Sequence, residues 1–298
     1  MDPITHSLAG ATIYNLGFRR KAALWVLLLA SISPDFDYIT RFGGLDIFLR
    51  YHRGITHGIL ALFVVPLILG ILFGYKRGFL YYFFIAFLGY ATHLFMDLTN
   101  QYGTRILSPL DWEQYSLDLT FIIDPYITLG FLLSVILCKM NKKRSITIAL
   151  VTIFLFIAYI GGRFYLQNKT MDFLKSNLEA NIYKAYPLPN DFLRWWFVAK
   201  SGNDVRIGFS DLFTGRICTQ EIYTLSEDDS FIERSKNERA VNNFLYFAKY
   251  PYADVTREKG KTIVTWRELS YSFIKGDHFV TKVIFNSEGK VLNSYFKF

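Results

Sequence analysis

Long apolar stretches with almost no charge alternate with short polar loops over the first 162 residues. A helix needs about 20 apolar residues to cross the roughly 30 Å hydrocarbon core of a bilayer, and the longer stretches nearly reach that length. The pattern predicts an α-helical polytopic membrane domain of about six segments, of which the first two are short enough to be re-entrant. The predicted segments are residues 5–18, 22–34, 55–74, 79–96, 121–138 and 146–162.

From residue 163 onward, the chain changes to shorter segments in which polar and aromatic residues alternate. Helical periodicity predicts an amphipathic helix over residues 163–181 and a further helix over 235–249. We therefore expect a membrane-embedded, metal-binding domain over residues 1–162 and a soluble α+β domain over 163–298, large enough to bury its own core. Strands are predicted from period-two alternation over residues 192–200, 205–210, 216–225, 261–272, 278–286 and 291–298.

Basic clusters without acidic residues occupy alternate loops of the predicted membrane domain, at residues 19–21, 76–77 and 139–144. The positive-inside rule assigns these loops to the cytoplasm and the intervening loops to the outside. We expect a multi-pass protein of the inner (cytoplasmic) membrane, with its second domain extracytoplasmic. Because the formal charge of +8 is concentrated in these short loops, membrane lipids are expected partners and nucleic acid is not.

Histidines and aspartates gather at one predicted side of the first domain. Four of the five histidines lie within the first 93 residues, and the nearby aspartates share the outer ends of the predicted segments. Helix ends alternate between the two sides, so a random distribution would have used both. Ionisable groups near hydrocarbon are costly unless they pair or bind something, so the pattern predicts a metal site. The expected ligands are His6, Asp35, Asp37, His52, His57, His93 and Asp97.

The residue types suggest both the metal and the chemistry. Imidazole and carboxylate together suit zinc first, with manganese or iron(II) as alternatives, and seven ligands favour two ions. A metal-activated water would then hydrolyse a substrate. We expect Asp37 or Asp124 to orient that water or act as base. His52 would be a ligand or an acid, and Arg53 would hold developing negative charge.

Other interpretations fit some of these residues. Asp124 precedes Pro125, so helix capping explains it equally well. The same site could hydrolyse an amide or an ester, although the His-Glu-x-x-His helix of many zinc peptidases is absent from the sequence. A metal-binding transporter or sensor without catalysis is another alternative, but a transporter should carry polar groups along its spans to both faces.

The motifs together resemble the YdjM-type inner-membrane family of bacteria, whose members are described as metal-dependent hydrolases. The resemblance covers about the first 130 residues. That family is in turn remotely similar to zinc-dependent phospholipase C and the single-strand nucleases related to it, which are helical and cleave phosphoesters at His/Asp sites. The resemblance implies hydrolysis of a phosphoester in a lipid or envelope molecule. The motifs are Thr5-His6, Pro34-Asp35-Phe36-Asp37, His52-Arg53-Gly54-Ile55-Thr56-His57, His93-Leu94-Phe95-Met96-Asp97 and Asp124-Pro125.

Overall fold

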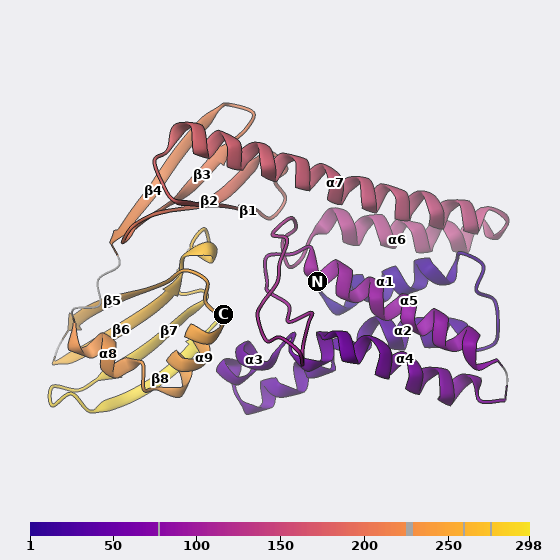
Figure 1. Cartoon of the computed structure of the whole chain (residues 1–298), viewed down its shortest axis with the longest axis horizontal. Helices are drawn as coiled ribbons and strands as arrows, with labels where there is room; N and C mark the ends of the chain where they lie inside the picture. Colours follow the sequence, from indigo (N-terminus) through magenta and orange to yellow (C-terminus); the bar gives the residue numbers. More distant parts are fainter. Residues whose placement is uncertain (77, 225–228, 259, 275) are drawn as a thin grey trace. The chain divides into compact units, whose positions relative to one another are not determined.

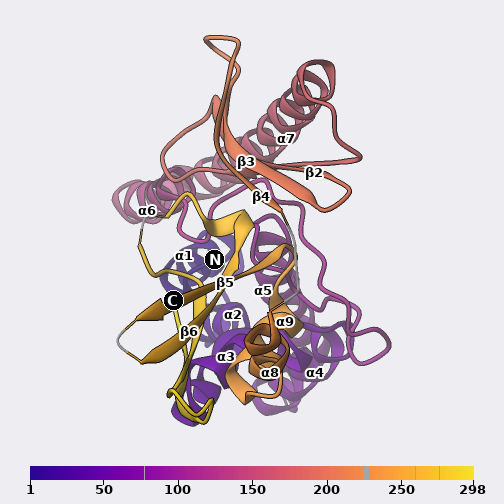
Figure 2. The same cartoon turned by 90° about the vertical axis from the view of Figure 1, so that its left-hand side faces the viewer.

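The computed structural model describes residues 1–76, 78–224, 229–258, 260–274 and 276–298. Arg77 of the second basic cluster and Leu225 of the third predicted strand lie outside the described residues. The chain divides into two compact units, with helices dominating the first and two sheets the second (Figure 1, Figure 2). The first unit comprises Met1–Asp37, Arg53–Leu166 and Pro187–Phe192, and the second Tyr38–His52, Gln167–Tyr186 and Leu193–Phe298.

The first unit is built from apolar helices. Two of them begin at an aspartate N-cap followed by proline, since Asp2 and Asp124 each accept hydrogen bonds from the first free backbone amides. The α-helices are α1 (Pro3–Tyr14), α2 (Ala23–Ile32), α4 (Ile59–Gly74), α5 (Phe79–Leu98), α6 (Pro125–Met140) and the first part of α7 (Ser145–Asn177). The 3-10 helices are the first part of η1 (Ser33–Gly43), which leaves this unit after Asp37, and η2 (Ile55–His57) and η3 (Lys142–Arg144).

Among the described residues, three helices are long and apolar enough to cross a membrane, and a fourth is counted if one bent pair forms a single span. The prediction of apolar spans in the first half of the chain is therefore confirmed. The count of six stays a prediction, because α1 has only 12 residues and α6 only 16. The three candidates are Ala23–Gly43, Phe79–Leu98 and Lys142–Asn177, and the bent pair is Leu45–His57 with Ile59–Gly74.

Helix α7 corrects the prediction of two separate helices over residues 146–162 and 163–181. It runs without a break through Gly161 and Gly162, has 33 residues and ends at Asn177. Glycine is frequent in membrane helices, so this pair does not end the helix. A side chain added at either glycine would meet nothing within 4 Å. The pair marks a change of composition rather than a helix end.

Helices α1, α2 and α5 pack closely around Ser31, at the end of α2. A Cβ atom added at Gly10 of α1 would lie 2.5 Å from Ser31 Oγ, and one added at Gly89 of α5 would lie 3.2 Å from the same atom. Small residues allow such close approach between membrane helices. The packing brings α1 and α5 to the point where α2 passes into η1, which carries Asp35. The buried cluster beside it contains Ile13, Ala23, Val26, Leu27, Ala30, Leu69, Tyr82, Ile85 and Ala86.

The second unit contains two four-stranded antiparallel sheets, and the strands of each sheet follow the order of the chain. The first sheet holds β1 (Ile182–Pro187), β2 (Arg194–Ser201), β3 (Asp204–Asp211) and β4 (Arg216–Thr224). The second holds β5 (Pro251–Glu258), β6 (Lys261–Glu268), β7 (Val280–Phe285) and β8 (Val291–Lys297). The unit also contains the helices α3 (Leu45–Tyr51), α8 (Ser230–Ser235), α9 (Arg239–Phe247) and η4 (Leu269–Tyr271).

These elements confirm an α/β domain with antiparallel sheets and correct several details. Strands β1 and β5 and helix α3 were not predicted, because their short, mixed sequences lack a clear period. The helix predicted over residues 235–249 is α9, which is shorter at both ends. Helix α8, which ends at Ser235, was not predicted, and Asp229 caps it by accepting from the amide of Phe231 at 2.8 Å. Trp195 and Trp196 are core residues, while His278 is exposed.

Candidate metal centre

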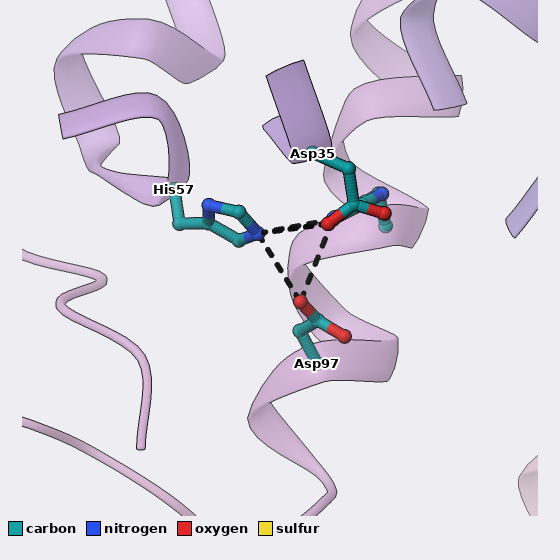
Figure 3. Close-up of side chains that lie close together, drawn as sticks. Asp35, His57 and Asp97 are labelled. Carbon is teal, nitrogen blue, oxygen red and sulfur yellow. Dashed lines mark hydrogen bonds and ion pairs between the residues drawn. The ribbon is translucent and has the colours of Figure 1, made fainter. Parts of the chain in front are cut away.

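Four buried side chains of the first unit, Asp35, His57, His93 and Asp97, meet beside the end of α2. Asp35 follows Pro34 in η1, His57 closes η2, and the other two lie four residues apart on α5. Each side chain offers one ligand atom, and the four atoms all lie within 4.8 Å of one another. In Figure 3, the side chains of Asp35, His57 and Asp97 point toward one another. The structure thus brings together four of the seven predicted ligands.

The distances between the ligand atoms fit one ion held by four ligands. Nε2 of His57 lies 3.2 Å from Nε2 of His93 and 3.2 Å from Oδ2 of Asp97. Nε2 of His93 lies 3.5 Å from the same Asp97 oxygen. Oδ1 of Asp35 lies 3.8 Å from each imidazole nitrogen. Ligands placed tetrahedrally at about 2.0–2.2 Å from zinc are roughly 3.3–3.6 Å apart, and the observed spacings bracket this value.

Neighbouring groups turn both imidazoles toward the centre. Nδ1 of His93 lies 2.7 Å from the carbonyl oxygen of Ser31, so it must donate and leave Nε2 with a free lone pair. Nδ1 of His57 lies 3.4 Å from Oδ2 of Asp37 and 3.1 Å from Oγ1 of Thr56. Carboxylate and carbonyl partners of this kind fix the tautomer and the orientation of metal-binding histidines. Asp37, predicted as a ligand or a base, therefore acts on the centre through His57.

The carboxylates are the groups that a cation would satisfy. Both side-chain oxygens of Asp35 are buried and accept no hydrogen bond, and the same holds for Oδ2 of Asp97. A buried carboxylate without donors is strongly destabilising unless positive charge lies beside it. Two imidazole lone pairs and two carboxylate oxygens aimed at one point repel one another and attract a divalent ion. This set of nitrogen and oxygen donors suits zinc, manganese or iron, so the residues present fit a metal.

Asp97 is held from its other side by charged and polar groups. Its Oδ1 accepts from Nη2 of Arg53 at 3.0 Å, lies 3.2 Å from Nε2 of His6, and contacts the amino group of Met1. Arg53 is only 1% exposed. Its guanidinium therefore orients a carboxylate of the chain itself. The ring of His6 stacks on that of His93, with centroids 3.6 Å apart. His6, predicted as a ligand, thus lies against the four-residue group and contacts two of its members.

Two predicted residues have other contacts. Asp124 accepts from the amides of Tyr126 and Ile127 at 3.0 and 3.2 Å and from the hydroxyl of Tyr159 at 2.7 Å. These contacts are those of a helix cap, the alternative explanation for this residue. His52 belongs to the second unit, where its ring stacks on Phe48 with centroids 4.5 Å apart, and its role as a ligand or an acid stays a prediction.

Sequence reasoning missed two groups that orient the histidines. Ser31 acts through its backbone carbonyl, which no side-chain pattern reveals. Thr56 donates from Oγ1 to Oδ2 of Asp37 at 3.0 Å and contacts His57, so it links the two residues. A polar residue directly before a histidine at the start of an apolar stretch was the available signal.

Comparisons with known proteins agree with this picture. A family model described as "YdjM inner membrane protein" matches residues 1–170, and one described as "YfhP C-terminal alpha/beta plait domain" matches residues 230–298. The uncharacterized protein YfhP of Bacillus subtilis (strain 168) is 27% identical over 182 residues, which are 60% of this chain and 55% of YfhP. The chain thus matches only about half the length of that relative. No solved structure matches the chain significantly. Because the first family model covers more than half of the sequence, including the whole metal centre, the chain belongs to the YdjM inner membrane protein family.

Proposed function

We propose that this protein is a membrane-bound, metal-dependent hydrolase that cleaves a phosphoester, with Asp35, His57, His93 and Asp97 holding the ion. The observation that supports the metal most directly is the pair of buried carboxylates whose inward oxygens accept no hydrogen bond and face two imidazole nitrogens. The choice of a phosphoester rests on the family resemblance, and an amide or ester substrate would use the same residues. All four ligands lie at or near helix ends, whereas a transport path would continue along the spans.

A bound divalent ion supplies Lewis acidity and lowers the pKa of a bound water toward about 7. The residues of the chain prepare the site for it. Asp37 and the Ser31 carbonyl keep the two Nε2 atoms directed inward, and Arg53 keeps Oδ2 of Asp97 directed inward. Hydrolysis adds the oxygen of water to phosphorus and breaks one P–O ester bond. One proton of the water goes to the leaving alcohol and the other is released.

We assign His6 as the base that accepts the proton released from the attacking water. Its Nε2 lies beside Oδ1 of Asp97, so this nitrogen donates and leaves a lone pair on Nδ1. Nδ1 is buried and has no hydrogen-bond partner. A carboxylate that orients one nitrogen of a histidine makes the other a better proton acceptor. Zinc is our first choice of metal, and manganese or iron(II), which accept more ligands, are the alternatives.

Metal analysis of the purified protein tests the proposal. We expect one equivalent of divalent metal per chain, or two if the predicted second ion is present. The variants His57→Ala, His93→Ala and Asp97→Ala should lose it, while His278→Ala, at an exposed site in the second unit, should keep it. Unchanged metal content in all three variants would eliminate the site. Metal-loaded protein should hydrolyse bis(p-nitrophenyl) phosphate. Metal binding without turnover of phosphoester, ester or amide probes would instead support a sensor or transporter.

The orientation can be tested with a native cysteine. We propose that the site and the second unit are extracytoplasmic, in agreement with the basic clusters of the predicted inner loops. Cys218 of the second unit is exposed, and Cys138 is buried. A membrane-impermeant maleimide added to intact cells should label Cys218, and Cys218→Ser should abolish the labelling. Labelling that requires permeabilised cells would show that the proposed orientation is wrong.

A further inference from the structure

An apolar groove of about 500 Å³ lies in the first unit. Side chains of α2, η1, η2 and α4 line it, together with Tyr90 of α5. Its volume is in the range of roughly 300–1,000 Å³ that is usual for small-molecule sites. Apart from Ser33, Thr56 and the Tyr90 hydroxyl, the side chains of its lining are entirely hydrocarbon. Such a lining selects an apolar occupant.

The groove is lined by residues that neighbour the ligands of the candidate metal centre in the chain. Ser33 lies two residues before Asp35, and Thr56 lies directly before His57. Tyr90, on the helix that carries the other two ligands, donates its hydroxyl to the carbonyl of Thr56. The backbone segments that present the ligands therefore also form the wall of the groove.

Other lining residues are open to the surroundings. Phe36 is 63% exposed, Val64 is 40% exposed and Ile68 is 50% exposed. Phe36 lies in a candidate membrane span, and the other two lie in the bent helix pair. Apolar side chains exposed on membrane helices face lipid, so a chain can enter the groove sideways from the bilayer.

We infer that the groove holds one hydrocarbon chain of an amphiphilic substrate whose phosphoester head lies at the metal centre. This inference rests on the proposed function and names its substrate class, a membrane phospholipid or another long-chain phosphoester. The groove contributes position rather than affinity, because lipid tails are as apolar as its leucine and isoleucine side chains. Holding the chain orients the head group relative to the ion, which is where binding in a defined pose accelerates a reaction.

Photo-crosslinking tests the groove without requiring turnover. The protein is placed in vesicles of phosphatidylethanolamine and phosphatidylglycerol, a fraction of the latter carrying a diazirine on its acyl chain. We expect labelling at the groove residues of α4, loss of that labelling in Ile68→Trp, and full labelling in Leu67→Trp. Leu67 is the matched control because it is 44% exposed on the same helix but does not line the groove. Equal labelling around α4, or labelling of the groove residues that Ile68→Trp leaves unchanged, would overturn the inference.

Turnover separates the inference from the proposed function. Ile68→Trp should lower kcat/KM for a long-chain phosphoester by about 10- to 100-fold, which is the usual cost of a misplaced substrate. The same substitution should leave kcat/KM for bis(p-nitrophenyl) phosphate unchanged. Leu67→Trp should change neither. Equal losses on both substrates would contradict the role of the groove. If neither substrate is hydrolysed by the metal-loaded protein, the proposed function fails, and the crosslinking result alone decides whether a chain occupies the groove.

Discussion

Asp35 allows the sharpest test of the metal centre, because a metal ion and its absence predict different effects for Asp35→Asn. In the folded chain, neither carboxylate oxygen accepts a hydrogen bond, and the side chain is buried. Without metal, this carboxylate is destabilising, so an uncharged amide of the same shape should leave stability unchanged or raise it. With metal, the carboxylate is a ligand, so the amide should remove metal-dependent stabilisation.

The size of the effect follows from ligand linkage. Free metal at 100 times its dissociation constant stabilises the folded wild type by about 2.7 kcal/mol. For a helical unit of this size, that corresponds to an increase of roughly 5–10 °C in the unfolding midpoint. The midpoint of Asp35→Asn should rise by less than about 2 °C with metal, and in chelator it should equal or exceed that of the wild type.

Thermal unfolding in detergent, with chelator and with added zinc or manganese, measures both quantities. Asp46→Asn is the matched control, because Asp46 is also buried but accepts from Nε of Arg239 at 2.9 Å and Nδ2 of Asn243 at 2.8 Å. Its loss should lower stability by about 1–3 kcal/mol in every condition. The reasoning about Asp35 would be refuted if Asp35→Asn were destabilised equally in chelator and in metal, since the protein itself would then satisfy the carboxylate.

Three further predictions concern orientation, packing and pH. Asp37→Asn should keep the metal but weaken its affinity by about 10- to 100-fold, measured by competition with a chromophoric chelator. Gly10→Val should lower the free energy of unfolding by about 1–3 kcal/mol and lower the metal content, because its Cβ would lie 2.5 Å from Ser31 Oγ. Gly130→Val, whose Cβ would meet nothing within 4 Å, should change neither quantity in the same thermal-unfolding and metal assays. Burial raises the pKa of Glu268. Its contribution to stability is therefore complete below the ordinary carboxyl pKa and is lost as pH rises through the raised pKa, and Glu268→Gln should flatten this part of the pH–stability curve.

The sequence could predict the members of the buried Asp/His group because the cost of burying them is chemical. Four polar side chains near the ends of apolar segments are costly wherever they lie, so their presence already implied a shared partner. The spacing of His93 and Asp97 then required a common helix face, which the structure confirms. The sequence could not distinguish residues that would bind the ion from residues that orient those ligands. Asp35 and Asp37 are two residues apart in one motif. The oxygens of Asp35 accept no hydrogen bond and lie at the centre, whereas Oδ2 of Asp37 accepts from the backbone amide of Arg53.

Helix ends and strand positions were less predictable because they depend on tertiary contacts. The glycine pair at residues 161–162 looked like a boundary, but the helix continues through it, since glycine is frequent in membrane helices. Strand β5 begins at Pro251 and carries charged residues at positions 254, 257 and 258, so its sequence has no period of two. Pairing along the whole length of β6 forms it instead.

Charge balance explains why these residues occur together. Among the side chains in mutual contact at the centre, three carboxylates, Asp35, Asp37 and Asp97, face one guanidinium, Arg53. The ring nitrogens of His57 and His93 lie against acceptors or against one another, as those of neutral ligands do. The side chains thus carry two net negative charges in a buried place, where isolated ions cost several kcal/mol each, and the amino group of Met1, which contacts Asp97, offsets at most one of them. A single divalent ion neutralises this excess at the point that the four ligand atoms surround. Arg53 and the Met1 amino group cannot do so, because both contact Asp97 and leave Asp35 without a hydrogen bond.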